Sequence, residues 1–251
     1  MARPHLSIVI PAYNEEDRLA AALPRVDEYL RSGAIDAEVL VVDDGSTDRT
    51  QAIASALLRE ERGRVLRQPE NAGKGAAVRR GVLAAQGRWV LITDADLSTP
   101  IEEHAKLAEV ARDEDLDAVI GSRDLPGSRV EIRQSAPRRL LGKAFNRILR
   151  PMTGLTYRDT QCGFKLLDRA RTRPLFERMV VDHFAYDVEL LFLCDRFGLR
   201  VKEVPVVWRN SARSTVSIVW APPRMLFDVV RLRWRFRRGL YNPRSGPVGE
   251  P

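Results

Sequence analysis

Apolar and polar positions follow a repeated order along the first 121 residues, in which short apolar runs are separated by longer amphipathic stretches. The apolar runs are rich in β-branched residues and nearly continuous, which is typical of strands covered on both faces of a parallel sheet. They occupy residues 6–11, 37–44, 64–68, 88–94 and 116–122. The stretches between them have helical spacing and cover roughly residues 15–31, 47–62, 75–85 and 101–112. This order predicts an α/β fold with a mainly parallel sheet flanked by helices.

The pattern changes after residue 122. Residues 122–139 are interrupted by Gly and Pro and carry a net positive charge, which predicts a long functional loop. A helix near 139–149, a helix over 183–197 and a strand over 199–208 are predicted to follow. No internal repeat and no clean boundary appears before about residue 210. We therefore expect residues 1–210 to form one catalytic domain.

The C-terminal region combines apolar and basic residues. Residues 222–240 contain Phe227, Trp234 and Phe236 together with six arginines. Such a basic amphipathic helix either lies in a membrane interface or packs on the domain with a basic, solvated face, and we favour the first. Residues 211–241 are thus predicted to associate with a membrane surface, and residues 242–251 to form a disordered tail. No apolar run is long enough to span a bilayer as a helix.

Composition narrows the class of partner. The chain has 251 residues and a formal net charge of +7, which favours an anionic partner such as nucleic acid, a phospholipid surface or a phosphorylated substrate. Its two cysteines, Cys162 and Cys194, do not form a dense disulfide framework. We expect a cytoplasmic protein, peripheral on the cytoplasmic face of a membrane.

Polar clusters follow four of the predicted strands. In a parallel sheet, ligands bind beyond the carboxyl ends of the strands, so these clusters should converge on one edge. Three of the four are acidic, which is more than ordinary surface loops require. The clusters are residues 12–15, 43–46, 94–96 and 121–123.

Asp94 and Asp96 form the most informative cluster. One acidic residue there would be explained as a helix cap, but Ser98 and Thr99 already serve that role. Two carboxylates one residue apart at the end of a strand suit Mg²⁺ or Mn²⁺, which take their other ligands from phosphates and water. We predict a metal site formed by Asp94 and Asp96.

Two further segments point to a nucleotide. Asp43 and Asp44 follow the second predicted strand, where carboxylates often accept hydrogen bonds from a nucleoside. In the segment NAGKGAAVRRG (71–81), glycines flank Lys74 at the start of a helix. Backbone N–H groups and a lysine at that point favour an anion, although the segment lacks the P-loop and dinucleotide patterns.

Several motifs together resemble a known family. SIVIPAYNEE, VVDDGSTDRT, ENAGKGAAVRRG, DADLS, GSRD and DTQCGFKLL occur in this order. They resemble a family-2 glycosyltransferase of the GT-A (Rossmann-like) fold, and most of all the polyprenyl-phosphate glycosyltransferases of the dolichyl-phosphate β-glucosyltransferase branch. The resemblance covers roughly residues 5–210. It implies inverting, metal-dependent transfer of a sugar from a nucleotide sugar, with UDP-glucose favoured, to polyprenyl phosphate.

The resemblance also implies roles for individual residues. It assigns metal binding to Asp94 and Asp96. It assigns nucleotide-sugar binding to Pro11, Tyr13, Glu15, Asp43, Asp44, Lys74, Asp94 and Ala95. It assigns binding of the acceptor phosphate to Arg123 and to one of Arg138 or Arg139. Gln161, Gly163, Phe164 and Lys165 match a segment near the sugar. Ser98 stands where mannosyl relatives often have Gln, and residues 210–217 depart from the family pattern, so no role is assigned to either.

The acceptor class follows from a chemical argument. A hydroxyl acceptor must lose a proton to a general base, whereas a lipid phosphate is already an anion and needs orientation and charge neutralisation. The arginine-rich loop 123–139 meets the second need. Asp187, or less plausibly Asp159, would act as a base or would hold basic residues. We favour the phosphate acceptor.

Two other functions are weighed against this one. The first is a glycosyltransferase that uses a hydroxyl acceptor in polysaccharide or glycolipid synthesis. The second, more remote, is a basic nucleic-acid-binding module. An acidic cleft would repel a phosphate backbone, and the aromatic residues gather in the tail, so we expect no nucleic acid partner.

Overall fold

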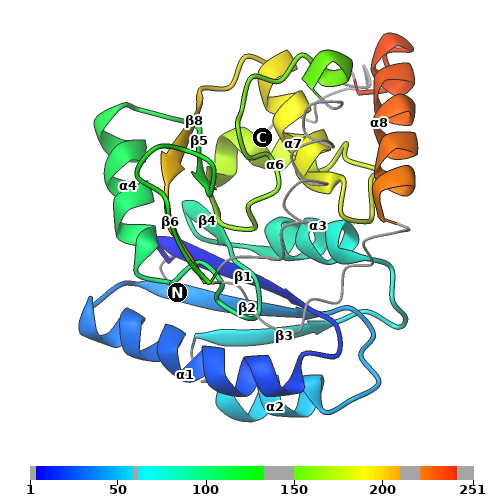
Figure 1. The fold of residues 1–251 in the computed structure, drawn as a ribbon. Coiled ribbons are helices and arrows are strands. Elements are labelled where there is room, and N and C mark those ends of the chain that lie inside the picture. The colour runs from blue at the N-terminus through cyan, green and yellow to red at the C-terminus, as the bar shows by residue number, and fades with distance from the viewer. Residues whose placement is uncertain (1–3, 59–61, 133–149, 210–220, 242–251) are drawn as a thin grey trace, which may run out of the picture.

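The computed structural model describes residues 4–58, 62–132, 150–209 and 221–241. A seven-stranded sheet forms its centre, with strand order β3-β2-β1-β4-β7-β5-β8 (Figure 1). The strands are β1 (Leu6–Ala12), β2 (Ala37–Asp43), β3 (Gly63–Arg67), β4 (Trp89–Ile92), β5 (Ala118–Ser122), β7 (Lys165–Asp168) and β8 (Val201–Pro205). Every residue of β1 is buried, as its continuous apolar run predicts. The mainly parallel α/β sheet is confirmed.

One strand runs against the others, and the sequence pattern did not reveal it. β7 pairs antiparallel with both β4 and β5, so that Lys165 lies beside Ile92 on one side and Ile120 on the other. The first residue of β7 is therefore at the edge where β4 and β5 end. This reversal brings the segment before β7 to the same edge as the loops after the parallel strands.

The single strand predicted over 199–208 is wrong in one respect, because it is two strands. β8 belongs to the main sheet, whereas β9 (Val207–Arg209) pairs with β6 (Arg129–Ile132) in a separate two-stranded sheet. Pro205 ends β8, in agreement with the inability of proline to donate to a strand ladder. The helix predicted near 139–149 lies outside the described residues.

Helices cover both faces of the sheet (Figure 1). One core contains side chains from α1, α2 and α4, and a second core on the other face contains side chains from α3, α6, α7 and α8. The helices are α1 (Glu16–Ser32), α2 (Thr50–Leu57), α3 (Lys74–Ala84), α4 (Glu103–Asp113), α6 (Arg169–Phe176), α7 (Tyr186–Arg196) and α8 (Ala221–Arg237). With apolar helices on each side, a two-sided core stabilises the parallel strands.

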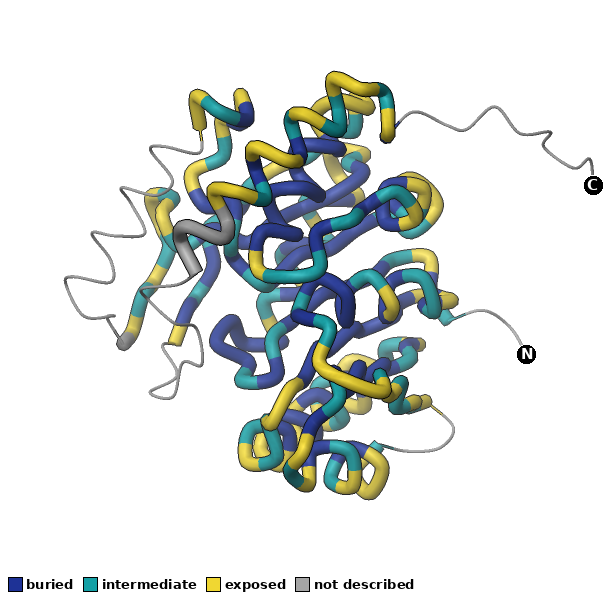
Figure 2. The backbone as a smooth tube through the Cα atoms, turned by 90° about the vertical axis from the view of Figure 1, so that its right-hand side faces the viewer, coloured by how far each residue is buried: buried dark blue, intermediate teal, exposed yellow. Residues whose placement is uncertain are grey.

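Helix α8 confirms the predicted tail helix and has apolar side chains on both its inner and its outer face. Val229 and Leu232 are buried against the domain. Its outer face nevertheless exposes large apolar side chains, and Figure 2 shows exposed residues along the length of this helix. These outward residues are Leu226, Phe227, Val230 and Trp234. No helix in the described part of the chain has both the length and the apolar character needed to cross a bilayer.

Candidate active site

The loops that leave the carboxyl ends of the strands meet at one edge, as the sequence predicted. The Asn14 backbone N–H donates to Ser46 Oγ at 2.9 Å, which joins the loops after β1 and β2. Burial raises the pKa of Glu15, Arg18 opposes that shift, and the nearby charges of Asp96 and Asp94 raise it further. The carboxylates after β1 and β4 are therefore close enough to sense one another.

Asp44 is occupied by the protein itself. Its two oxygens accept hydrogen bonds from the Ala72 and Gly73 backbone N–H groups, at 2.9 and 2.8 Å, and from the Gln68 side chain. Gly73 has φ +107°, a conformation that favours glycine. The loop before α3 was predicted to receive an anion, and the anion it receives in this structure is Asp44. The role of this carboxylate is to shape the loop that carries Lys74.

Asp43 is fully buried at the end of β2. Its Oδ1 accepts from the Ser46 backbone N–H at 3.0 Å, which closes the turn that follows the strand. No described residue makes a hydrogen bond to its Oδ2, and Arg67 Nε lies 3.7 Å away. Asp43 therefore holds the turn at the base of the site.

Asp94 forms an ion pair with Lys74. Lys74 Nζ lies 2.5 Å from Asp94 Oδ1, and both side chains are partly exposed. Burial by itself would raise the pKa of Asp94, but Lys74 and then Lys165 outweigh it and hold that pKa below its usual value. Burial likewise opposes the charge on Lys74, while Asp94 and Asp187 raise its pKa. Both groups are thus ionised at neutral pH.

Gly163 explains how another segment reaches Asp94. A Cβ atom at this position would lie 2.3 Å from Asp94 Oδ2, which is far inside van der Waals contact. Only a residue without a side chain lets the chain before β7 pass so close to the carboxylate. The predicted place of Gly163 near the reacting groups therefore has a steric basis.

Asp94 and Asp96 fit a divalent cation that takes most of its ligands from elsewhere. Asp96 Oδ1 accepts the Ser98 backbone N–H at 2.9 Å, and no described residue donates to its other oxygen. Within the described chain, no group of three or more His, Cys, Asp or Glu side chains has the arrangement of a complete metal site. Two carboxylates at the mouth of a site suit Mg²⁺ or Mn²⁺ completed by phosphate oxygens and water.

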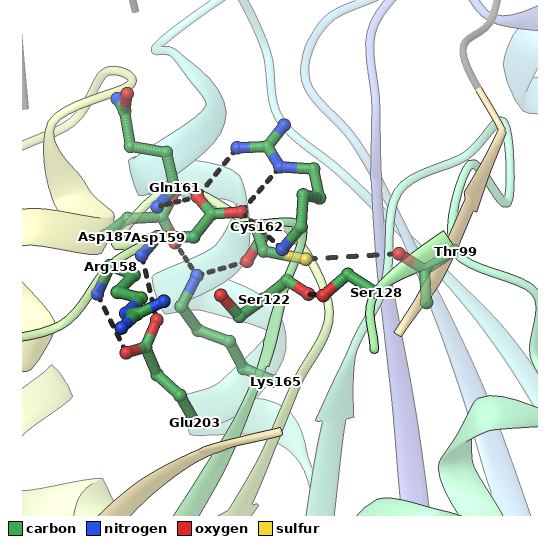
Figure 3. A network of polar contacts seen from close by, with 11 residues as sticks. Thr99, Ser122, Ser128, Arg158, Asp159, Gln161, Cys162, Lys165, Asp187 and Glu203 are labelled. Atoms are coloured by element: carbon green, nitrogen blue, oxygen red, sulfur yellow. Dashed lines mark hydrogen bonds and ion pairs between the residues drawn. The ribbon is translucent and has the colours of Figure 1, made fainter. Parts of the chain in front are cut away.

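Arg123 and Asp159 form a bidentate ion pair on the other side of the site. Arg123 Nε and Nη2 donate to the two carboxylate oxygens at 2.6 and 2.8 Å, and the guanidinium lies over the Trp208 ring. Glu203 accepts the Asp159 backbone N–H at 2.8 Å and so fixes the partner (Figure 3). Burial would raise the pKa of Asp159, but Arg123 lowers it below its usual value.

Lys165 and Asp187 form a second, deeper pair. Lys165 is fully buried, and its ammonium donates to Asp187 Oδ1 and to the Cys162 carbonyl oxygen, each at 2.5 Å (Figure 3). Burial raises the pKa of Asp187 even though Lys165 opposes it. An aspartate that is buried and bonded to a lysine is suited to holding that lysine. The predicted pairing of Asp187 with a basic residue therefore matches its surroundings.

The site thus combines strand-end carboxylates with paired lysine and arginine side chains. Residues 7–184 match the family described as Glycosyl transferase family 2. The chain belongs to glycosyl transferase family 2. It is 36% identical over 252 residues to a dolichyl-phosphate beta-glucosyltransferase of Drosophila melanogaster, covering 94% of this chain and 76% of that relative.

Solved structures agree on the fold. Glucosyl-3-phosphoglycerate synthase of Mycobacterium tuberculosis in complex with UDP is 25% identical, with a TM-score of 0.67 over 97% of this chain and 82% of that one. The same synthase in complex with Mn²⁺, UDP and glucosyl-3-phosphoglycerate is 23% identical, with a TM-score of 0.66 and the same two coverages. The GT-A fold expected from the motifs is confirmed.

The remaining predicted residues of this glycosyltransferase lie around the same edge. Tyr13 is exposed, whereas Pro11 and Ala95 are buried. Glu15 accepts Arg18 through both oxygens, at 2.6 and 2.7 Å, so that its charge is already matched. The Gln161 backbone N–H donates to Asp159 Oδ1, and its side chain extends away from the Lys165 cluster (Figure 3). Arg138 and Arg139 lie outside the described residues.

Two carboxylates that matter to the site were not predicted. Glu203 on β8 supports Asp159, and Glu189 on α7 holds the segment before that helix. Glu203 follows Lys202 in VKEVP, and Glu189 follows Asp187 by two residues in DVELLF. For Glu189, the signal was a second carboxylate two residues after Asp187 in an otherwise apolar helical run, because a charge is buried only with partners.

Proposed function

We propose that this glycosyltransferase transfers glucose from UDP-glucose to a polyprenyl phosphate of the dolichyl type, with inversion at the anomeric carbon. The observation that carries the proposal is the arrangement of opposite charges around one edge of the sheet. Asp94 forms an ion pair with Lys74, Asp96 lies nearby, and the guanidinium of Arg123, held by Asp159, is close enough to lower the pKa of Asp94. The names of the similar curated proteins support the same substrates.

The donor side would bind the diphosphate. Asp94 and Asp96 would hold a divalent cation, Mg²⁺ or Mn²⁺, which supplies charge neutralisation for the departing nucleoside diphosphate. Lys74, placed 2.5 Å from Asp94, adds a positive charge at the same point. The Mn²⁺ and UDP in the complex of the similar synthase support this assignment. Asp43 and Asp44 shape the nucleotide pocket by closing the turn after β2 and by holding the Lys74 loop.

The acceptor side would orient a phosphate. A lipid phosphate is already ionised, so its oxygen can attack the anomeric carbon opposite the leaving group without a general base. Arg123 keeps 28% of its side chain exposed while Asp159 fixes its orientation, which leaves part of the guanidinium free to meet an anion. Asp187 is engaged by Lys165 and is thereby placed to position rather than to remove a proton.

Helix α8 would bring the enzyme to its lipid. Its outward apolar residues recur at 226, 230 and 234, which is one face of a helix, with Phe227 beside them and exposed Arg231 nearby. In Figure 1, α8 stands on the side of the molecule toward which the carboxyl ends of β1 and β2 point. We infer peripheral binding to the cytoplasmic face of a membrane, with the site edge facing the lipid acceptor.

The decisive experiment supplies both substrates to purified protein. Polyprenyl phosphate, Mn²⁺ or Mg²⁺ and a panel of nucleotide sugars are incubated with the protein, and the lipid fraction is analysed by mass spectrometry. A polyprenyl-phosphate hexose formed best from UDP-glucose, with its sugar released by mild acid, is the expected result. Sugar on a hydroxyl acceptor would favour polysaccharide or glycolipid synthesis instead. Absence of lipid-linked sugar with every donor would refute the proposal.

Membrane association has its own test. Wild-type protein should sediment with vesicles that contain anionic phospholipid, and a variant with Phe227→Ser and Trp234→Ser should remain in the supernatant. Leu57→Ser on α2 is the matched control, because Leu57 is also an exposed apolar residue but belongs to the other helical layer. Equal sedimentation of all three proteins would contradict the role of α8.

A further inference from the structure

The loop that carries Lys74 is pressed against a distant segment of the chain. A Cβ atom at Gly73 would lie 2.4 Å from the Asp182 carbonyl oxygen, and one at Gly75 would lie 2.4 Å from the Val181 carbonyl oxygen. The Ala76 backbone N–H donates to the same Asp182 oxygen at 3.0 Å. The two glycines beside Lys74 therefore permit direct backbone contact with residues 181–182. Any displacement of this segment moves the start of α3.

Glu189 holds that segment in place. Its Oε2 accepts the Val181 backbone N–H at 2.9 Å, and both of its oxygens accept the Val180 backbone N–H, at 3.0 and 3.1 Å. Glu189 is fully buried on α7. A second contact comes from Arg79, whose guanidinium lies 2.8 Å from Asp182 Oδ1. Residues 180–182 are thus fixed between α7 and α3.

Glu189 is in turn held by a residue that follows α8. The Tyr241 hydroxyl donates to Glu189 Oε1 at 2.5 Å, and the tyrosine side chain is fully buried. A buried carboxylate keeps its orientation only if its oxygens have donors, and here two backbone N–H groups and one hydroxyl supply them. The contacts run without a break from Tyr241 through Glu189 and residues 180–182 to the loop of Lys74.

We propose that Glu189, oriented by Tyr241, is a positioning residue for the donor site, because it sets the place of Lys74 beside Asp94 through residues 180–182. Neither side chain touches the diphosphate. The inference rests on the proposed function in one respect, namely that Lys74 meets the diphosphate of a nucleotide sugar. It adds that the strength of donor binding depends on a carboxylate and a hydroxyl from two other helical regions.

Substitution of single atoms tests this role. Glu189→Gln keeps the size of the side chain but replaces one acceptor oxygen with an NH₂ group, which is a donor facing other donors. Tyr241→Phe removes only the hydroxyl. We expect the Kd for UDP, measured by calorimetry with MnCl₂ present, to rise about tenfold in Glu189→Gln and about threefold in Tyr241→Phe.

The double variant sharpens the assignment. If Tyr241 acts through Glu189, Glu189→Gln combined with Tyr241→Phe should bind UDP as Glu189→Gln does, instead of showing the product of the two effects. Tyr29→Phe is the matched control. Its hydroxyl is 3.0 Å from His104 Nδ1, at a contact between α1 and α4 on the other face of the sheet. This control should lower the melting temperature and leave the Kd for UDP unchanged.

The possible failures are distinguishable. A wild-type protein that binds no UDP contradicts the proposed function. Wild-type binding that neither variant weakens, with melting temperatures lowered as in Tyr29→Phe, overturns the positioning role alone. If Glu189→Gln does not fold, Tyr241→Phe decides the question, since loss of one hydroxyl leaves the packing of the ring in place.

Discussion

Two pairs of aspartates, at the carboxyl ends of the parallel strands β2 and β4 on either side of β1, have opposite surroundings. Asp43 and Asp44, after β2, are buried and are bonded mainly to backbone N–H groups of adjacent loops. Asp94 and Asp96, after β4, are partly exposed and face Lys74 and the open edge of the sheet. The first pair builds the loops of the site, and the second is available to a cation.

The difference follows from the position of each loop. The chain after β2 turns back beneath the loop before α3, so its carboxylates are covered and must find donors within the protein. Strand β4 lies at the centre of the sheet, between β1 and β7, and the loop after it is at the edge where ligands bind in a parallel sheet. A buried acidic turn of this kind therefore stabilises neighbouring loops, whereas an exposed one is available to bind a cation.

The strongest test of the comparison removes one charge from the exposed pair. Asp96→Asn should lower the rate of sugar transfer about 10³-fold, or about 4 kcal/mol, because the cation loses a charged ligand. The melting temperature should change little, since the asparagine side-chain oxygen can accept the same Ser98 backbone N–H that Asp96 accepts. Turnover assays with a Mn²⁺ titration measure the effect, and Asp113→Asn on the exposed end of α4 is the control. Full activity of Asp96→Asn would refute the metal role.

The converse change concerns the buried pair. Asp44→Ala should lower the free energy of unfolding by about 3 kcal/mol, because two buried backbone N–H groups and the Gln68 side chain lose their acceptor. Urea denaturation measures the difference. An unfolding free energy that changes as little as in Asp96→Asn would show that the two pairs do not differ as described.

Asp159 sharpens the comparison, because it is buried like Asp44 but forms an ion pair with a basic side chain, Arg123, as Asp94 does with Lys74. Arg123 lowers its pKa in the folded state, so the ion pair contributes stability above the unfolded carboxyl pKa of about 3.9. That contribution is lost as the pH falls through the lower, folded pKa. We expect Asp159→Asn to lose about 2 kcal/mol at neutral pH and to show a smaller further loss than wild type below about pH 4. Parallel acid dependences of the two proteins would contradict this.

The smallest expected effect concerns the space beside Asp94. Gly163→Ala should reduce transfer about tenfold, since the new methyl group would displace the Asp94 carboxylate or the chain before β7. Gly33→Ala, at the end of α1 with φ −84°, is the control, because a Cβ there would lie 3.0 Å from the flexible Ile35 side chain and 3.2 Å from the Tyr29 carbonyl oxygen, away from the site, and it should leave activity unchanged. Unchanged activity of Gly163→Ala would show that the contact is not needed for catalysis.

The parallel strands and the edge on which their loops converge could be predicted because their signal is local. Continuous apolar runs identified β1, β2 and β4, and the carboxyl-end rule identified Asp94 and Asp96. Strand β7 could not be predicted, because KLLD is short and its direction depends on pairing with β4 and β5. The role of Asp44 was also hidden, because its donors lie 28 and 29 residues further along the chain. Burial and distant partners are tertiary properties that a local pattern does not contain.

The reversed direction of β7 has a consequence for how such enzymes diversify. Ile120 and Lys165 are paired neighbours, so the chain leaves the sheet after β5 and returns at β7 along the same edge. The intervening stretch starts and ends at adjacent points of the main sheet, and its strand β6 pairs with β9 outside that sheet, so changes within it need not move a strand of the main sheet. That stretch contributes Arg123 and Asp159, which the proposed function places on the acceptor side, and Gly163 beside Asp94. Under the proposed function, this topology separates the carboxylates after β4, assigned to the donor, from the stretch between β5 and β7, so that changes in that stretch would alter the acceptor without altering the donor site.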